Sequence, residues 1–324
     1  MELEANRYGR IGVLMGGPST EREISLKSGK AVYEHLCNAG FEVVAIDVTT
    51  DDRQQNIELI HAQRIQCAFL ALHGRFGEDG QIQEILDTLR IPYTGPGALA
   101  SKLAMDKVAS RRIFERHGLD VPRYKVLDEV SYAANSLSGL PFCLPVVVKP
   151  ASHGSSIGLS IVDDPAGLGA AIEEAFRYDR QVILEEYIHG REVTVGILDE
   201  QPLPVIEIIP KRKFFDYEAK YKPGMTEYVV PAQLDEQIAS KIQAAALSAY
   251  RLLGCVGCSR VDIILDGRQR PFVLEVNTIP GLTATSLLPK AAMIIGIDFT
   301  RLCLRLLDLA YEKTKTQAQT ESAV

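Results

Sequence analysis

Apolar runs alternate with amphipathic helical patterns over roughly the first ninety residues of the chain. These patterns predict strands at 11–15, 41–47 and 67–72 and helices at 25–39 and 81–89. Strands that alternate with helices in this way predict a parallel sheet, whose functional groups gather at the carboxyl ends of the strands. Two polar segments follow such ends, Gly16–Glu23 and His73–Gly80. We therefore expect the chemistry of this region to lie in those two segments.

The remainder of the chain divides into two further units. The turn-rich segment Pro92–Gly97 ends the first unit, and a second change of pattern follows His189–Gly190. The further predicted elements are helices at 98–117, 165–177 and 237–253, strands at 146–149, 160–162, 181–187, 192–198, 203–209, 259–266 and 271–277, and two C-terminal helices with a frayed end at 314–324. We predict an α/β and α+β protein with an N-terminal βαβ domain at 1–97, a central domain at 98–190 and a C-terminal domain at 191–324.

The composition is that of a globular, acidic protein. Of 324 residues, 46% are hydrophobic and 24% are charged, and 35 Lys and Arg against 42 Asp and Glu give a net charge of −7. General binding to nucleic acid is disfavoured, because it requires a basic face. The sequence has no apolar stretch of membrane-spanning length and a polar start, so we expect a cytoplasmic protein. Cys255 and Cys258 have the spacing of metal ligands but are interpreted as part of a buried strand.

Two neighbouring predicted strands near the C-terminus carry acidic side chains within otherwise apolar runs. If their hairpin closes with Asp266 opposite Pro271, Asp262 lies directly opposite Glu275. Two carboxylates in these positions repel each other, and an unpaired charge within an apolar strand is costly. A divalent cation between them would explain the pair, and a solvated face of the sheet is the alternative.

The same register places Asn277 opposite Arg260, on the strand face that carries Glu275. Carboxylate and amide oxygens suit Mg²⁺ or Mn²⁺ better than zinc. A small number of protein ligands would leave coordination positions for water and for nucleotide phosphates. We therefore predict that Asp262, Glu275 and Asn277 form a site for Mg²⁺ or Mn²⁺.

Two glycine-containing or basic loops are candidates for binding an anion. The loop at 149–158 joins two apolar strands, and its glycines allow backbone N–H groups to surround a phosphate, with Lys149 pointing inwards. A plain hairpin loop with a surface lysine is the alternative. The basic, aromatic loop at 211–228 is interpreted as a lid over an anion, or alternatively as a solvated loop. The sequence contains no P-loop signature, and no G-x-G-x-x-G follows the first strand.

Five segments of the chain together resemble the D-alanine–D-alanine ligase family of ATP-grasp carboxylate–amine ligases. Each motif alone is moderately specific, but five in the right order are highly specific, and the resemblance covers nearly the whole chain. The segments are Gly16–Leu26, His73–Gly80, Lys149–Gly158, Asp216–Tyr221 and Leu274–Leu282. The resemblance implies a three-domain ATP-grasp architecture with an N-terminal parallel-sheet domain and two neighbouring Mg²⁺ (or Mn²⁺) ions.

The resemblance also implies how ATP and the metal ions are held. Two lysines would contact the phosphates, a third would reach the γ-phosphate from the lid, the segment at 185–188 would meet adenine mostly by its backbone, and a glutamate would bind the ribose. Asp262 and Glu275 would hold one ion, and Glu275 with Asn277 the other. The residues implied for ATP are Lys107, Lys149, Ser156, Glu185, Glu186, Ile188, Glu192 and Lys220.

For the amino-acid substrates, the resemblance implies a second set of side chains. Glu21 would anchor the ammonium of the first D-alanine, with His73 nearby and with Ser155 and Tyr221 completing a hydrogen-bonded network. On its own, a carboxylate at a helix start could also be favoured by the helix dipole. The remaining implied residues are Arg260 and the Gly281 N–H, which would form an oxyanion pocket, and Ser286 and Leu287, which would contact the second D-alanine.

The implied activity is ATP-dependent ligation of two D-alanine molecules through an acyl phosphate, for peptidoglycan precursor synthesis, by a homodimer. A ligase that joins D-alanine to a hydroxy acid such as D-lactate is the close alternative, and Tyr221 favours an amine acceptor. A non-catalytic nucleotide-binding protein is the alternative from another class. The retained residues Lys149, Arg260, Asp262, Glu275 and Asn277 argue against it.

Overall fold

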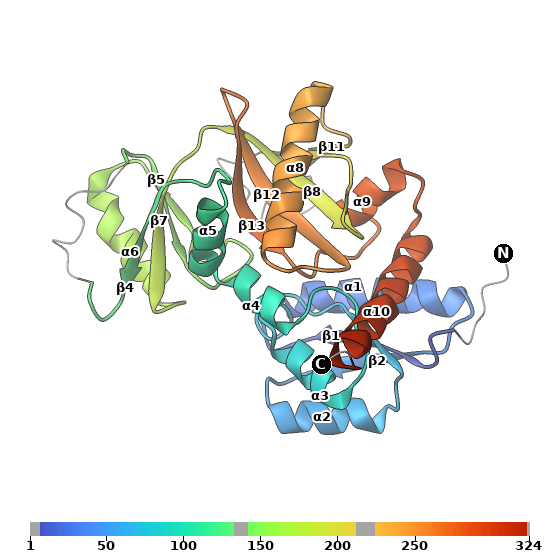
Figure 1. Cartoon of the computed structure of the whole chain (residues 1–324). Helices are drawn as coiled ribbons and strands as arrows, with labels where there is room; N and C mark the ends of the chain where they lie inside the picture. The colour runs from blue at the N-terminus through green and yellow to red at the C-terminus, as the bar shows by residue number, and fades with distance from the viewer. Residues whose placement is uncertain (1–6, 133–141, 212–223, 323–324) are drawn as a thin grey trace.

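The computed structural model describes residues 7–132, 142–211 and 224–322, with side chains up to residue 313. Lys220, Tyr221 and most of the predicted lid loop lie outside the described residues. In the described part of the chain the strands form three sheets, with helices packed against them (Figure 1). The mixed helix and sheet content predicted from the sequence is confirmed.

The N-terminal sheet is parallel, as predicted, with strand order β2-β1-β3. The central strand β1 is buried along its whole length, because helices cover both faces of the sheet (Figure 1). The elements are β1 (Ile11–Gly16), α1 (Arg22–Asn38), β2 (Val43–Val48), α2 (Arg53–Ala62), β3 (Cys67–Leu70) and α3 (Gln81–Leu89).

Helix α2 was not predicted, because its amphipathic pattern is weak. Only Asn56 and Ile60 are buried among its ten residues. The helix begins instead at a local cap, where the side chain of Asp52 accepts a hydrogen bond of 2.8 Å from the Gln55 N–H. The start of α1 is also earlier than predicted, at Arg22, so that Glu21 lies at the helix N-terminus.

The central sheet is antiparallel and has the order β4-β7-β5-β6. Its elements are α4 (Ala98–Met105), α5 (Lys107–Arg116), β4 (Tyr124–Asp128), β5 (Val146–Pro150), β6 (Ser160–Val162), a 3₁₀ turn (Pro165–Gly167), α6 (Leu168–Phe176) and β7 (Gln181–Glu186). The single helix predicted at 98–117 is wrong, because Asp106 has an extended backbone and caps a new helix through hydrogen bonds from the N–H groups of Val108 and Ala109. Strand β4, which is mostly half-buried, was not predicted.

The C-terminal sheet is antiparallel, with order β11-β10-β8-β12-β13 and β9 paired to β8. Helix α8 covers one face with an apolar stripe that includes Ile238, Ile242 and Ala246. The elements are β8 (Gly190–Leu198), β9 (Gln201–Pro202), β10 (Ile206–Pro210), β11 (Thr226–Val229), α8 (Glu236–Leu252), β12 (Cys258–Asp266), β13 (Pro271–Asn277), α9 (Leu287–Ile294) and α10 (Phe299–Ser322). The end of the predicted lid loop is therefore strand β11.

The last helix returns to the N-terminal sheet. Leu302 and Leu306 of α10 share a buried core with Val13 of β1 and Phe69 of β3, and Figure 1 shows α10 lying across that unit. The predicted fraying after residue 313 is wrong, since the backbone is helical to Ser322. None of the helices in the described ranges is both long and apolar enough to span a membrane.

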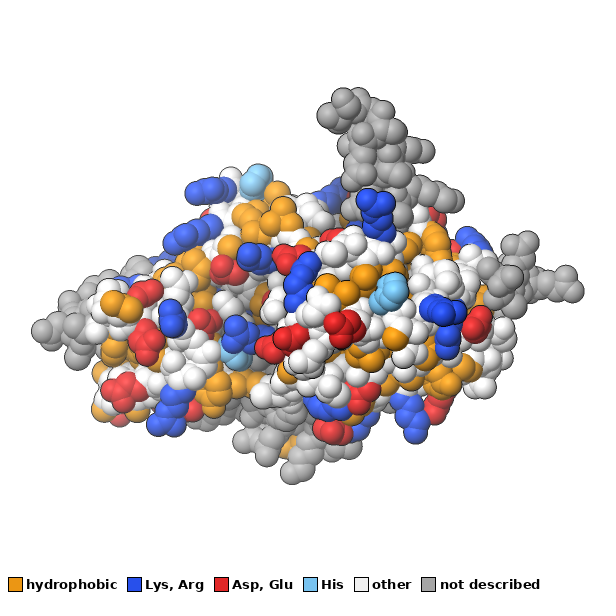
Figure 2. All heavy atoms as spheres, turned by 90° about the horizontal axis from the view of Figure 1, so that it is seen from below, with side chains coloured by type: hydrophobic (Ala, Val, Ile, Leu, Met, Phe, Trp, Pro, Cys, Tyr) orange, Lys and Arg blue, Asp and Glu red, His pale blue; other side chains and the backbone are white. Residues whose placement is uncertain are grey.

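On the face of the molecule shown in Figure 2, basic and acidic side chains are interspersed among apolar and uncharged ones. That face therefore carries no single-sign stripe of the kind that binds nucleic acid. Cys255 and Cys258 are both buried in the core, where burial raises the pKa of each thiol to about 12. Cys258 begins strand β12, as the interpretation requires, but Cys255 precedes the strand and Val256 between the two is exposed.

Candidate active site

The hairpin of β12 and β13 brings the predicted acidic pair together. Asp262 pairs with Glu275, as predicted, but the closure of the hairpin is wrong by one residue, because Pro271 pairs with Leu265. A β-bulge after Asp262 absorbs the difference, with Leu274 as the extra residue of β13. The bulge thus restores the carboxylate pairing that the turn alone would have shifted.

Each carboxylate of this pair has a cationic partner within the chain. The guanidinium of Arg260 donates two hydrogen bonds to Asp262, of 3.0 and 2.9 Å, and Nζ of Lys107 lies 3.7 Å from Glu275. Thr194 Oγ1 and Asn277 Nδ2 also donate to Asp262, over 2.6 and 3.0 Å. Cationic groups of the chain therefore offset the negative charge of both carboxylates. A metal ion is one explanation for the pair, and these ion pairs are another.

The oxygen donors of the hairpin nevertheless fit a hard divalent cation. The two carboxylates lie opposite each other at one end of the hairpin, and Asn277 lies beside them with its Nδ2 directed to Asp262. The described ranges contain no group of three or more His, Cys, Asp or Glu side chains that could hold a metal. A site formed here would therefore leave most coordination positions to water or to substrate oxygens, as Mg²⁺ sites commonly do.

A cavity of about 420 Å³ lies between the central and C-terminal sheets. Its wall includes Asp262 and Glu275 together with all the residues predicted for ATP that the structure describes. Those residues are Lys107, Lys149, Ser156, Glu185, Glu186, Ile188 and Glu192. The structure thus brings them together, while their roles stay predictions.

Lys149 presents a buried ammonium group at the wall of this cavity. Its Nζ lies 3.0 Å from Oε2 of Glu185, and both side chains are less than 10% exposed. Burial lowers the pKa of Lys149 to about 8, and Glu185 opposes that shift by favouring the charged form. Glu186, next along β7, instead pairs with Arg123 at 2.8 Å, and this hydrogen bond lowers its pKa.

A second cavity, of about 350 Å³, lies between the N-terminal unit and the C-terminal sheet. It is lined by all the described residues that were predicted to bind the amino-acid substrates, and by Asn277 as well. They are Glu21, His73, Ser155, Arg260, Gly281, Ser286 and Leu287. The β12–β13 hairpin therefore contributes to the walls of both cavities, with Asp262 lining the first and Arg260 lining the second.

Glu21 lines this second cavity and accepts a hydrogen bond from the glycine- and serine-rich loop. It is 7% exposed, and the hydroxyl of Ser155 donates a hydrogen bond to one of its oxygens. Ser155 and Ser156 have φ of 54° and 57°, a costly conformation for residues other than glycine. Gly74 has φ of 75°, and a Cβ there would lie 2.6 Å from Glu21. The backbone at Ser155 and Ser156 is therefore strained, and the space beside the Glu21 carboxylate admits only glycine at position 74.

His73 is neutral and has a defined tautomer. Its Nδ1 lies 3.1 Å from the carbonyl oxygen of Ile279, which can only accept, so Nδ1 carries the proton. Nε2, 2.9 Å from the hydroxyl of Ser28, therefore accepts a hydrogen bond. Burial lowers the pKa of His73, which keeps the ring uncharged.

The sequence does not single out four residues that line these cavities or contact their walls. Glu78 accepts hydrogen bonds from the N–H groups of Gly74 and Ile279, and burial raises its pKa to about 8. It lies within the motif at 73–80, so the motif itself could have indicated it. The others are Ser28 of α1, Arg111 of α5 and Thr194 of β8, which no local pattern distinguishes from ordinary buried residues.

Comparison with known proteins gives matches along nearly the whole chain. The family models described as D-ala D-ala ligase N-terminus and D-ala D-ala ligase C-terminus match residues 10–58 and 50–96 and residues 113–308, respectively. The D-alanine–D-alanine ligase of Geotalea uraniireducens is 48% identical over 310 residues, or 96% of this chain and 98% of the relative. That of Syntrophotalea carbinolica is 47% identical over 307 residues, or 95% and 98%.

Solved structures agree with the family models. The crystal structure of D-alanine–D-alanine ligase from Bacillus anthracis is 37% identical, has a TM-score of 0.85, and is matched over 95% of this chain and 99% of that chain. The VanG D-Ala:D-Ser ligase from Enterococcus faecalis is 32% identical with a TM-score of 0.82, over 94% and 100%. The fold predicted for the chain is that of these ligases. The chain therefore belongs to the D-alanine–D-alanine ligase family.

Proposed function

We propose that the protein uses ATP to join two molecules of D-alanine into D-alanyl-D-alanine, with release of ADP and phosphate. The observation that carries this proposal is that one hairpin, β12–β13, lines both cavities. A nucleotide in the larger cavity and an amino acid in the smaller one would place the phosphate donor next to a carboxylate. The dipeptide would supply peptidoglycan precursor synthesis.

The metal sites are part of the proposal. Asp262 and Glu275 would hold one Mg²⁺ or Mn²⁺ ion, and Glu275 with Asn277 the second. Bound divalent cations would neutralise charge on the phosphoryl oxygens. We expect Glu275→Gln to abolish ligation and keep the fold, because the amide removes a charge that would serve both ions. The check is ADP release together with a thermal melt, and near-normal activity in the folded variant would contradict the metal assignment.

In the first step, an oxygen of the D-alanine carboxylate attacks the γ-phosphorus of ATP, and the bond to the bridging oxygen breaks to release ADP. The buried ammonium groups of Lys107 and Lys149 lie in the cavity wall, where they would offset the negative charge of the phosphates. Glu21 would bind the substrate ammonium in the smaller cavity and direct the carboxylate towards the nucleotide. The product of this step is an acyl phosphate.

In the second step, the amine of the other D-alanine attacks the acyl carbon, the amine loses a proton, and phosphate leaves as the peptide bond forms. Arg260 and the Gly281 N–H would stabilise the oxyanion, and removal of one such donor costs about 3–4 kcal/mol in other enzymes. Ser286 and Leu287 begin α9, so the carboxylate of the second D-alanine would lie near a helix N-terminus. Lys220 and Tyr221 would act from the lid.

The domain division at 97 and 190, a homodimeric assembly and a cytoplasmic location are also proposed, on the resemblance to the family. Size-exclusion chromatography with light scattering tests the dimer. A monomeric mass at micromolar concentration would contradict it.

The experiment that tests the proposed activity is phosphate release by the purified protein with ATP, Mg²⁺ and either D- or L-alanine. We expect release only with D-alanine, matched by an equal amount of dipeptide detected by mass spectrometry. Release of phosphate that does not depend on D-alanine would contradict the proposal, as would failure to hydrolyse or transfer phosphate at all.

The acceptor amino acid is tested separately, because the VanG relative is named as a D-Ala:D-Ser ligase. With D-alanine, D-serine and D-lactate in competition, we expect D-alanyl-D-alanine as the main product. Tyr221→Phe should shift the products towards the hydroxy acid, since the tyrosine is expected to favour an amine acceptor. An unchanged product distribution would count against that role.

A further inference from the structure

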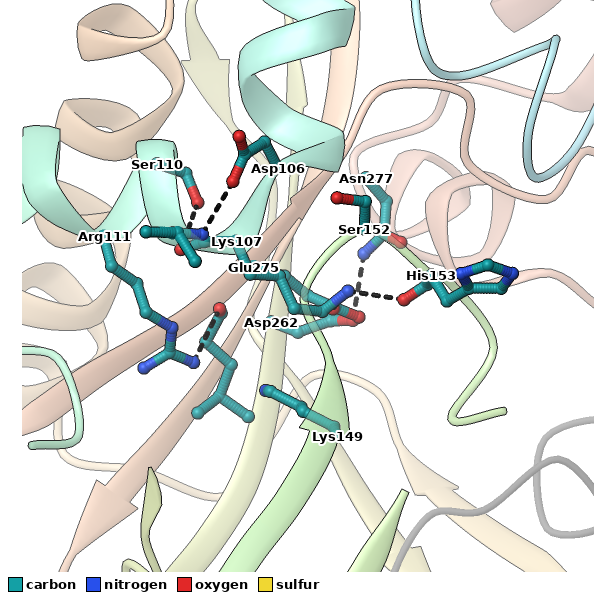
Figure 3. A network of polar contacts seen from close by, with 12 residues as sticks. Asp106, Lys107, Ser110, Arg111, Lys149, Ser152, His153, Asp262, Glu275 and Asn277 are labelled. Carbon is teal, nitrogen blue, oxygen red and sulfur yellow. Dashed lines mark hydrogen bonds and ion pairs between the residues drawn. The ribbon is translucent and has the colours of Figure 1, made fainter. Parts of the chain in front are cut away.

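Helix α5 carries two cationic side chains on the face that packs beside the larger cavity, the one proposed for the nucleotide. Lys107 and Arg111 lie four residues apart, so they project from the same face of the helix. Figure 3 shows Lys107 extending towards the loop at His153 and towards Glu275, whereas Arg111 extends towards the backbone of β13. Lys107 lines the cavity and Arg111 does not, although its side chain is fully buried.

Arg111 holds the carboxylate that in turn holds Lys149. Its Nη2 lies 2.7 Å from Oε1 of Glu185, and Oε2 of the same glutamate lies 3.0 Å from Nζ of Lys149. The guanidinium lies against Oε1 as a charge contact, without the geometry of a hydrogen bond, and Glu185 presents its other oxygen to the lysine. The ammonium of Lys149 is therefore held at a fixed place on the cavity wall.

The same guanidinium reaches the C-terminal sheet. Nη2 of Arg111 donates a hydrogen bond of 3.3 Å to the carbonyl oxygen of Leu274. Leu274 is the extra residue of the β-bulge and directly precedes Glu275. Arg111 thus connects β7 of the central sheet with the segment of β13 that carries Glu275.

The cost of this arrangement argues for a role beyond stability. Nε and Nη1 of Arg111 have no hydrogen-bond partner in the part of the chain that the structure describes. A buried guanidinium with unsatisfied donors is expensive, and a buried ion pair contributes little net stability compared with apolar residues of the same volume. Arg111 is therefore better explained by the groups that its contacts hold in place than by a contribution to stability.

We propose that Arg111 is a positioning residue for the nucleotide. It fixes Lys149 through Glu185 and fixes the segment before Glu275 through the Leu274 carbonyl, without touching a substrate itself. This inference rests on the proposed function, which assigns the phosphates to Lys149 and the metal ions to Glu275. Without the guanidinium, both oxygens of Glu185 are free to pair with Lys149, and the ammonium is drawn away from the phosphates.

The test compares Arg111→Met, Arg111→Lys and the matched control Arg112→Met, which changes an exposed arginine of the same helix. The affinity for ATP with Mg²⁺ is measured by calorimetry, and KM for ATP and for D-alanine by ADP release, on variants shown to be folded by circular dichroism. We expect Arg111→Met to weaken ATP binding by on the order of tenfold, the loss typical of one contact to a charged group. KM for D-alanine should stay within about twofold, as should all values for Arg112→Met.

Arg111→Lys keeps the cation next to Glu185 and should recover most of the lost affinity. An ATP affinity of folded Arg111→Met within about twofold of wild type would overturn the proposal, as would a lower kcat at unchanged ATP affinity. If Arg111→Met does not fold, Arg111→Gln, which removes the positive charge but keeps a polar side chain, takes its place. An ATP affinity of folded Arg111→Gln within about twofold of wild type would then overturn the proposal, and a loss confined to ATP would support it. Wild-type protein that binds ATP but forms no dipeptide would refute the proposed function alone, while the calorimetric comparison would still decide the role of Arg111.

Discussion

The buried ammonium of Lys149 makes nucleotide binding sensitive to alkaline pH. The pKa of this lysine is lowered to about 8, first by burial and then by the positive charges of Arg111 and Lys107 on α5. Glu185 of β7 and Glu275 of β13 act in the opposite direction. The charged lysine is the form that attracts phosphate, so affinity should be high below this pKa and should fall as the pH rises through it.

The size of the effect follows from the pKa. In the free protein, about three-quarters of Lys149 is charged at pH 7.5 and about a tenth at pH 9, if the pKa is about 8. If ATP binds only to protein in which Lys149 is charged, the affinity for ATP falls about eightfold between these two pH values. An exposed lysine, with a pKa of about 10.4, would give almost no change over the same range.

Direct binding of ATP with Mg²⁺, measured by calorimetry between pH 7.5 and 9.5, is the appropriate assay. Turnover would confuse the result, because the attacking amine of D-alanine also titrates in this range. The control is Lys149→Gln, which should bind ATP more weakly at pH 7.5 and show no further loss up to pH 9. In Glu185→Gln, the midpoint of the loss of ATP affinity with pH should lie at a lower pH than in wild type, because Glu185 favours the charged lysine. An affinity of the wild-type protein that is constant up to pH 9.5 would refute this reasoning.

Two further predictions concern packing and hydrogen bonding beneath the site. Gly29→Ala in α1 should lower the free energy of unfolding by about 1–3 kcal/mol, although alanine favours helix, because its Cβ would lie 2.4 Å from that of Met15. In contrast, Gly169→Ala in α6, whose Cβ would meet nothing within 4 Å, should raise it by about 0.5–1 kcal/mol. Urea unfolding measures both, and equal effects would contradict the packing argument. Thr194→Val should cost about 1.5–3 kcal/mol, because it removes the 2.6 Å hydrogen bond to the Asp262 carboxylate, and an unchanged urea midpoint would contradict this.

The elements predicted best from the sequence are those with a strong local signal. Helix α3 has a well-separated apolar face and was predicted at its observed bounds, as was strand β13. Helix α2 was missed because its buried face is small, and the break before α5 was missed because a single residue, Asp106, ends one helix and caps the next. The pattern of apolar and polar residues therefore fails to predict a helix boundary where a single capping side chain, rather than a repeating pattern, determines the backbone conformation.

Motifs in the sequence indicated the candidate site residues, and those that the structure describes line the two cavities. What the sequence could not provide is the set of contacts between segments far apart along the chain. The bulge at Leu274 corrects the register of the hairpin, and Arg111 meets Glu185 and Leu274 only because three segments fold together. Compensation of Asp262 by Arg260, two residues away on the same strand, was also missed, because alternation alone does not predict a side-chain conformation.

Transfer of oxygen from D-alanine to phosphate tests the central claim most directly. The protein would be incubated with ATP, Mg²⁺ and D-alanine whose carboxylate carries ¹⁸O, and the released phosphate would be analysed by mass spectrometry. Attack of the carboxylate on the γ-phosphorus predicts one labelled oxygen in each phosphate released for each dipeptide formed. Dipeptide accompanied by unlabelled phosphate would contradict the account.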